Sequence, residues 1–290
     1  MANSDTFAPA VPWRAFFVFF GLVTVVLAAP PTAQTPLAQI GKPDAAEAAR
    51  ILTQFRQSGI AGQYYLEFEL HQLPRRGEEK VFHGRLWGGR NAEGAIFRIS
   101  VTDETGRDIR LLVQNGAHAA VWRMGPGGVV EVTGPVFEPI VSGVQLAAFD
   151  LQMPFLYWPD ATVESIARIR QRPAHEFIFR PPEKFAAQHP ELGSVRSYFD
   201  AQFNAPVQTE LLGRNGAVLK TLALVDLKKV GDQMLIKSLD VRDEVTRDKT
   251  RLLFTAAALN VDHAPNVFEP AALAVEIPRP PTARLVPLEP

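Results

Sequence analysis

The stretch QYYLEFEL, residues 63–70, decides the fold of this 290-residue chain. Apolar side chains stand at Leu66 and Phe68, and carboxylates stand beside them at Glu67 and Glu69. Successive side chains of a strand point to opposite faces of its sheet, so a period of two separates the two chemistries. The stretch therefore predicts a strand of an antiparallel sheet, with one face in a core and the other toward water.

The same period recurs on both sides of the chain's middle, between signals for tight turns. Asn215 followed by Gly216 is the strongest of these signals, because this pair favours two-residue hairpin turns. Short strands joined by hairpins indicate meanders. Residues 161–172 fit a helix or a strand equally well. The other predicted strands are 81–87, 95–101, 109–113, 119–124 and 129–133 in a first meander, and 195–203, 206–213, 217–225, 233–241 and 251–258 in a second.

The middle of the chain interrupts the alternation with a dense apolar segment, residues 144–159. It reads VQLAAFDLQMPFLYWP and carries a single charge, that of Asp150. The irregular spacing predicts a helix-loop-helix, and a segment this apolar does not suit an exposed connection. It either plugs the core or covers the opening of a cavity as a lid. The side chains that would form the lid are Phe149, Met153, Phe155, Leu156 and Trp158.

A helix is predicted before the first meander. Asp44 can cap its first turn, with Glu47 as the reciprocal capping residue. Its apolar positions then follow a helical period and form one stripe, which should pack on the rest of the domain. That stripe consists of Ala48, Ile51, Leu52 and Phe55.

The N-terminal residues predict export. Residues 15–29, AFFVFFGLVTVVLAA, form an uncharged run behind Arg14, which is the layout of a secretory signal. The run is shorter than the roughly 20 residues of a stable membrane span, although an uncleaved anchor remains an alternative. A periplasmic location follows. The predicted divisions are a signal peptide or N-terminal anchor (1–33), a linker (34–43), a β domain (44–272) and an extended, mobile proline-rich tail (273–290).

Composition excludes several kinds of chemistry. The chain has no cysteine, which rules out disulfides, thiolate metal sites and lipoprotein acylation of the chain itself. Its six histidines show no zinc-binding spacing, and no nucleophile elbow or phosphate loop is present. A net charge of −1 gives no indication of the basic surface that nucleic-acid binding requires. We therefore expect no cofactor, no metal, no catalytic residue and no enzymatic activity.

The arrangement resembles the LolA-like outer-membrane lipoprotein-sorting proteins. Three stretches carry the resemblance, FDLQMPFLYWPD (149–160), KSLDVRDEVTRDKTRLLF (237–254) and NVDHAPNVFEP (260–270), and it covers residues 44–272. It implies a mainly β (α+β) fold, an incomplete antiparallel β-barrel or curved sheet with a helical lid. It also implies an arginine that latches the lid, and the sequence does not choose between Arg85 and Arg98.

The resemblance implies a periplasmic carrier that holds the acyl chains of lipoproteins or lipids in an apolar cavity, with transient or peripheral membrane contact. Burying an acyl chain needs a dry cavity rather than catalysis. The alternative is an RseB-like sensing or scaffolding module that binds an envelope protein by its rim. The residues expected to line the cavity are Leu66, Phe68, Phe97, Ile99, Leu235 and Leu239.

Overall fold

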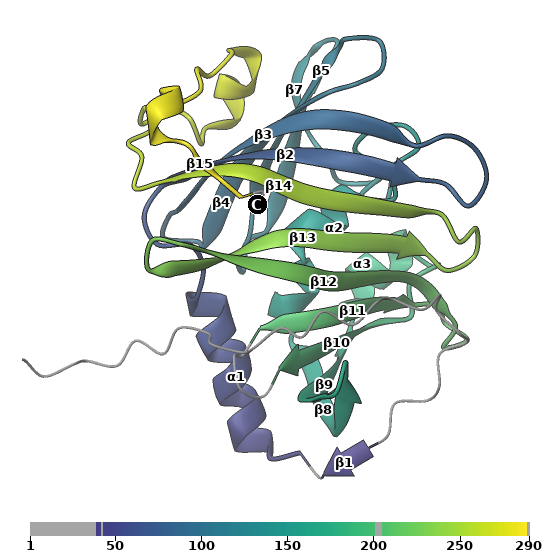
Figure 1. Cartoon of the computed structure of the whole chain (residues 1–290). Helices are drawn as coiled ribbons and strands as arrows, with labels where there is room; N and C mark the ends of the chain where they lie inside the picture. The colour runs from purple at the N-terminus through teal and green to yellow at the C-terminus, as the bar shows by residue number, and fades with distance from the viewer. Residues whose placement is uncertain (1–38, 42, 201–204, 289–290) are drawn as a thin grey trace, which may run out of the picture.

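The computed structural model describes residues 39–41, 43–200 and 205–288, and one antiparallel sheet of 15 strands forms its body (Figure 1). The strand order is β1-β8-β9-β10-β11-β12-β13-β14-β2-β3-β4-β5-β6-β7, and β15 pairs with β14 beside this path. Within the described residues, the end strands β1 and β7 do not pair with each other. The sheet therefore curves without closing, which confirms the predicted incomplete barrel.

The strands of the two predicted meanders are all present, and residues 161–172 fall mainly in a strand. The strands are β1 (Gln39–Gly41), β2 (Tyr64–Leu73), β3 (Lys80–Arg90), β4 (Ala95–Thr102), β5 (Asp108–Gln114), β6 (Ala120–Gly125), β7 (Gly128–Glu131), β8 (Asp160–Ile169), β9 (Arg172–Arg180), β10 (Ser194–Asp200), β11 (Pro206–Leu212), β12 (Val218–Val230), β13 (Gln233–Asp243), β14 (Lys249–Leu259) and β15 (Val286–Pro287). The helices are α1 (Ala45–Gln57), α2 (Ala148–Gln152) and α3 (Glu183–Gln188), with 3-10 turns η1 (Pro154–Tyr157), η2 (Pro270–Ala274) and η3 (Thr282–Arg284).

Pairing between β2 and β14 joins the two meanders into one sheet. Phe68 of β2 lies opposite Phe254 of β14, and their rings meet edge to face with centroids 6.1 Å apart. The contact spans most of the domain's sequence, since β2 begins the first meander and β14 ends the second. This long-range pairing places the middle segment, residues 144–159, inside the curve of the sheet.

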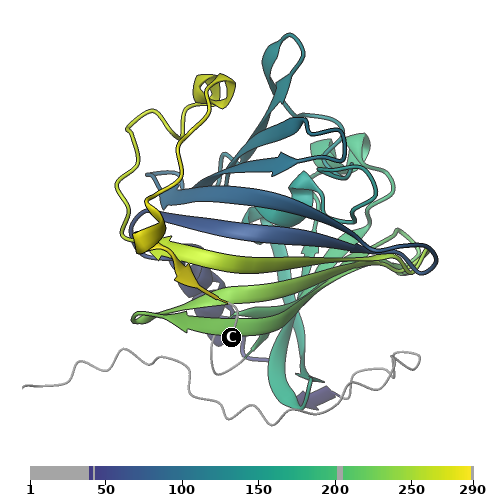
Figure 2. The same cartoon turned by 45° about the horizontal axis from the view of Figure 1, so that its top comes forward.

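The inner, concave face of the sheet carries the core. Leu66 and Phe68 of β2 are buried in the main hydrophobic cluster, while Glu67 between them belongs to the outer face. The alternation read from residues 63–70 therefore describes the strand correctly. The same cluster includes buried residues from α1, α2 and η1, so these helical segments pack on the concave side (Figures 1 and 2).

Helix α1 forms as its sequence predicts. The Asp44 side chain accepts hydrogen bonds from the backbone N–H groups of Ala46 and Glu47, which satisfies two of the free donors at the helix start. Ala48, Ile51 and Leu52 are buried, and Phe55 meets the ring of Phe199 edge to face at 5.3 Å. The stripe thus fixes α1 across strand β10.

The C-terminal residues pack on the outer face of the sheet, whereas the sequence predicts a mobile tail. Proline alternates here with apolar side chains: Ile277 and Leu285 pack beside Tyr65 and Trp87 on the outer face, whereas Leu288 is buried in the main cluster of the core. Strand β15 pairs with β14. The composition that favours an extended chain also supplies the apolar contacts that hold it, and residues 273–288 form a strap over the outer face (Figure 2).

Two arginines of the outer face bind the carbonyl groups at the end of η2. Arg98 donates to the carbonyl oxygens of Ala272 and Val275 at 2.7 and 2.5 Å. Arg110 donates to the carbonyl oxygen of Leu273 at 3.1 Å. Positive side chains complement the carbonyl groups at the end of a helix, and the Ala272 carbonyl accepts from the backbone N–H of Val275 at 3.0 Å as well. These contacts anchor the start of the strap.

Gly84 allows close packing of Phe68, which leads to a first prediction. A Cβ atom at Gly84 would lie 2.2 Å from the Phe68 ring, which is itself 3% exposed and has little room to move. We expect Gly84→Ala to lower the free energy of unfolding by about 1–3 kcal/mol, as overpacking does. Chemical denaturation measures the loss. Gly134→Ala is the control, because nothing lies within 4 Å of its Cβ position; equal losses would refute the explanation.

The predicted export segment, residues 1–33, and most of the predicted linker lie outside the described residues. None of the helices in the described part of the chain has the length and apolar character that crossing a bilayer requires.

Candidate functional site

The concave interior brings together the residues expected to line a cavity. Leu66, Phe68, Phe97, Ile99 and Leu235 are buried members of one hydrophobic cluster, and Leu239 is half-buried against it. They come from β2, β4 and β13, which are separate in sequence but share the inner face. In this structure they contact other core side chains, so their lining of a space for a ligand stays a prediction.

The predicted lid segment occupies the same interior. Helix α2 and turn η1 form the expected helix-loop-helix, and Met153 joins them in a left-handed conformation with φ of 48°. Phe149, Phe155, Leu156 and Trp158 are each less than 10% exposed, and Met153 is half-buried. In the conformation described, the segment therefore fills the concave side of the sheet.

An aromatic series connects this segment to the sheet. The Phe155 ring lies 6.0 Å from that of Phe149 and 5.4 Å from that of Phe179 on β9. Phe177 and Phe199 continue the series toward α1 at centroid distances of 6.0 and 5.3 Å. Movement of the segment would therefore expose large apolar surfaces on both sides.

Polar contacts through Asp150, Leu156 and Gln152 help to fasten the segment. The Lys220 ammonium of β12 lies 2.8 Å from the Asp150 carboxylate, whose side chain is completely buried. Arg56 of α1 donates to the Leu156 carbonyl oxygen at 2.7 Å. Gln152 donates to the carbonyl oxygen of Gln114 at 3.1 Å. Neither Arg85 nor Arg98 contributes, because both line the groove on the outer face.

An apolar pocket of about 270 Å³ opens beside α2. Its apolar walls include Leu111 and Ile140 of the core, Val130 of edge strand β7 and Ala148 of α2. The sequence gives no regular pattern for residues 132–140, which complete this pocket, so periodicity could not identify it. Here the interior comes close to the surface at an open end of the sheet.

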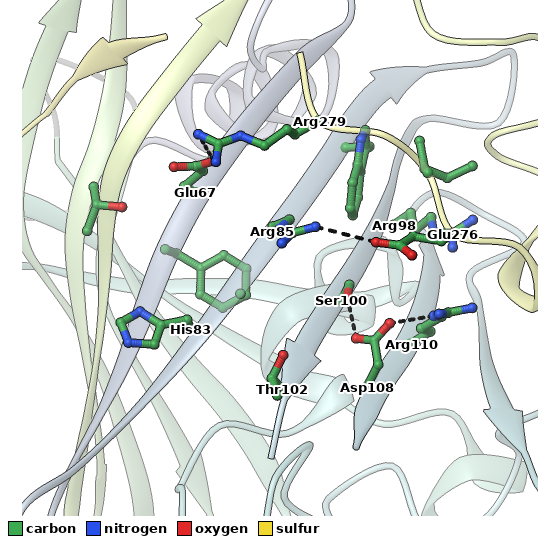
Figure 3. Close-up of a pocket in the computed structure, with 15 residues that line it drawn as sticks. Glu67, His83, Arg85, Arg98, Ser100, Thr102, Asp108, Arg110, Glu276 and Arg279 are labelled. Atoms are coloured by element: carbon green, nitrogen blue, oxygen red, sulfur yellow. Dashed lines mark hydrogen bonds and ion pairs between the residues drawn. The ribbon is translucent and has the colours of Figure 1, made fainter. Parts of the chain in front are cut away.

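A second hollow lies on the opposite, outer face. This groove, of about 440 Å³, runs between strands β2–β5 and the strap (Figure 3). We call it the outer groove. Its charged and hydroxyl-bearing lining is Glu67, His83, Arg85, Arg98, Ser100, Thr102, Asp108, Arg110, Thr255, Glu276 and Arg279. Sequence reasoning missed this site, because residues spread from 67 to 279 meet only through the sheet and the docked strap.

Histidine and acid clusters give no further site in the described part of the chain. No group of three or more histidine, aspartate or glutamate side chains there is placed to hold a metal ion. Asp240 of β13 pairs with Arg251 of β14 at 2.7 Å, and against the effect of burial this arginine holds the pKa of the Asp240 carboxyl below its usual value. This ion pair links two neighbouring strands, which is a structural role rather than a catalytic one.

Comparisons with known proteins establish the fold. A LolA superfamily protein from Nitrosomonas europaea superposes with a TM-score of 0.59 at 14% identity, covering 76% of this chain and 96% of its own. A domain from Vibrio parahaemolyticus, assigned to outer membrane lipoprotein-sorting proteins, gives 0.65 at 16% identity, with 77% and 96% coverage. A DUF1329 family protein from Desulfovibrio piger gives 0.66 at 12% identity, with 80% and 100% coverage.

Sequence comparisons find no counterpart, since no protein-family model and no curated protein matches this chain. At identities of 12–16% the structural likeness concerns the fold alone. The fold predicted from residues 44–272 is thereby confirmed.

Proposed function

We propose that this chain, which has the LolA-like fold, is an exported carrier that holds the acyl chains of a lipoprotein or lipid without covalent chemistry. The observation that carries the proposal is the apolar concave face, closed by a separate helical segment rather than by a second sheet. A structural neighbour assigned to lipoprotein sorting supports the same cargo class. The apolar run at residues 15–29 supports export to the periplasm.

The concave interior could hold either an acyl chain or the apolar side chains of α2 and η1, because both would bury similar apolar surface. Burial of an acyl chain contributes about 0.8 kcal/mol per methylene, so a chain of ordinary length binds well without any polar contact. Phe149, Phe155 and Trp158 contribute a comparable burial when the interior holds no ligand. The protein thus keeps a dry interior in both states, and the cargo competes with its own side chains.

The pocket beside α2 is the proposed entrance. Its walls are mainly apolar, with Arg123, Glu131 and Glu138 also among them, it touches Ala148 of α2, and it lies beside β7 at the open end of the sheet. A hydrocarbon tail that enters there reaches α2 first. Displacement of α2 and η1 then requires separation of Lys220 from Asp150 and of Arg56 from the Leu156 carbonyl. A partner surface that bound the displaced α2 and η1 would therefore promote both entry and release of the acyl chain.

Native mass spectrometry of gently purified full-length protein tests this function. We expect the protein to carry bound lipid in a fixed ratio, and this lipid should dissociate on activation in the gas phase. In solution, a fluorescent fatty acid at saturating concentration should replace it. The physical reason is that the lipid would occupy the apolar interior in place of the α2–η1 side chains. Absence of co-purified lipid together with absence of saturable fatty-acid binding would refute the carrier role.

A further inference from the structure

The outer groove is separated from the concave interior by the sheet itself, and its chemistry is different. The carrier function gives it no task. Arg98 and Trp87, which oppose each other on β4 and β3, both border it. The Arg98 guanidinium stacks over the Trp87 ring with its central carbon 5.7 Å from the ring centroid. These two side chains form the buried end of the groove.

Two hydrogen-bond donors at this buried end lack an acceptor. Trp87 is 2% exposed and Arg98 is 1% exposed. Neither Nε1 of Trp87 nor Nε of Arg98 has a hydrogen-bond partner among the described residues. Buried N–H groups in native proteins are nearly always paired, because an unpaired donor loses its hydration without compensation. Both groups can only donate, so their missing partner is an acceptor.

A third donor group near the opening is almost free. The Arg85 guanidinium has an ion pair with Glu276 at 3.9 Å, which is beyond hydrogen-bond distance. The Glu276 side chain is 77% exposed and belongs to the strap, so little fixes it in place. Figure 3 shows Arg85 and Glu276 together at the groove, beside Arg98. A better acceptor could replace Glu276 without disturbing the sheet.

The charges of the groove leave a positive excess. Glu67 pairs with Arg279 at 3.1 Å and Asp108 with Arg110 at 2.6 Å. The pair of Arg85 and Glu276 completes three neutral sets. Arg98 is the remaining charge, and the hydrogen bonds of its guanidinium go to the neutral carbonyl groups of the strap.

The environment of Arg98 agrees with this uncompensated charge. Burial, and after it the positive charge of neighbouring Arg110, lower the pKa of Arg98 to about 10, while Asp108 acts in the opposite direction. The guanidinium stays protonated at neutral pH and its charge lacks a close acid. An anion in the groove would relieve this cost.

We propose that the outer groove binds a phosphate group, either of free phosphate or of a phospholipid headgroup. Several phosphate oxygens can accept at once from a guanidinium and from donors at other angles, and guanidinium groups bind phosphate in bidentate fashion. Arg85 would leave Glu276 and bind the phosphate at the opening. The indole N–H of Trp87 and Nε of Arg98 are closed off from solvent in this structure, so they would donate from the buried end once the strap shifts outward. The site is independent of the acyl-chain proposal.

The test is a titration followed by NMR of the full-length protein labelled with nitrogen-15. The indole N–H signal of Trp87 is assigned by its loss in Trp87→Phe, and the chain has four tryptophans to distinguish. Sodium phosphate is compared with sodium chloride at equal ionic strength. We expect a saturable shift of the Trp87 signal with phosphate alone, because the signal reports the proposed hydrogen bond.

Arg85→Gln and Arg168→Gln provide the matched pair of variants. Arg85 is half-exposed on β3, and Arg168 is exposed on β8, which lies far along the sheet. Loss of one charge-assisted hydrogen bond at Arg85 should weaken binding about tenfold. Arg168→Gln should leave the affinity unchanged. Equal weakening in both variants would show unspecific attraction to positive charge and would overturn the site.

The source of the phosphate follows from a second arm with vesicles. Saturation by inorganic phosphate supports a site for free phosphate. A response only to phosphatidylglycerol vesicles, and not to phosphatidylcholine vesicles, supports a lipid headgroup. If the Trp87 signal responds to neither phosphate nor vesicles, the proposal fails. Fatty-acid binding in the interior is measured separately, so failure of the groove and failure of the carrier function are distinguishable.

Discussion

Lys220→Met is expected to lower the free energy of unfolding by about 3–5 kcal/mol, which is the usual cost of leaving a buried charge without its partner. The Asp150 side chain is fully buried and Lys220 is 14% exposed, so water cannot replace the ammonium. One oxygen of Asp150 already lacks a hydrogen-bond partner in the described part of the chain. The other also accepts from the backbone N–H of Ala147 at 2.8 Å. Urea denaturation measures the change.

A second variant and a control separate the buried pair from charge in general. Lys220→Met combined with Asp150→Asn removes both charges and keeps an acceptor for the Ala147 N–H, so most of the stability should return. The pair of Lys80 and Glu104 is separated by 2.7 Å, close to the 2.8 Å of the buried pair, but both side chains are about half exposed. Lys80→Met should therefore cost less than about 1 kcal/mol. A small loss in Lys220→Met would mean that Asp150 needs no cation.

Much of the sheet could be predicted from the sequence, because alternation of apolar and polar side chains follows directly from the geometry of a half-buried strand. Residues 63–70 place apolar and charged side chains on opposite faces, and the structure buries Leu66 and Phe68 as that alternation requires. Strand β8 was ambiguous in sequence. The register of its pairing with β9 shifts between Val163 and Ser165, and this bulge hides the period of two.

The outer groove and the strap could not be predicted, because both arise only from tertiary contacts. Arg98 and Arg110 appear in sequence as charges of a strand, yet they bind carbonyl groups 174 and 163 residues later. Proline-rich composition in the strap favours an extended chain but says nothing of where that chain packs. Long-range polar contacts leave no periodic signal, so sequence reasoning recovered the inner face far better than the outer face.

The two faces of the sheet suggest a division of tasks. The inner face offers apolar surface covered by a separate helical segment, which suits an acyl chain if the segment moves as the carrier proposal requires. The outer face offers donors without acceptors and one uncompensated positive charge. On these two proposals, the acyl chain and the phosphate group bind on opposite sides of one sheet. Mutation should therefore abolish either binding activity without affecting the other.

Phe155→Ala should strengthen the binding of a fluorescent fatty acid about tenfold or more. Phe155 is 2% exposed and lies between Phe149, Trp158 and Phe179. Its removal weakens the packing of η1, so the displaced segment becomes more populated, and apparent affinity rises with the population that can bind. The same change leaves apolar space beside the entering chain. Fluorescence titration measures the affinity.

Phe82→Ala is the control for this effect, because Phe82 is 3% exposed on β3 and belongs to the same core. Both variants should lose about 3–5 kcal/mol of stability, as large core truncations do. Only Phe155→Ala should gain affinity, since Phe82 lies on the sheet and not on the segment that must move. Phe155→Leu should give a smaller gain at lower cost to folding. Equal affinities in all three variants would mean that fatty acid does not enter past η1, and the concave interior would then be a permanent core.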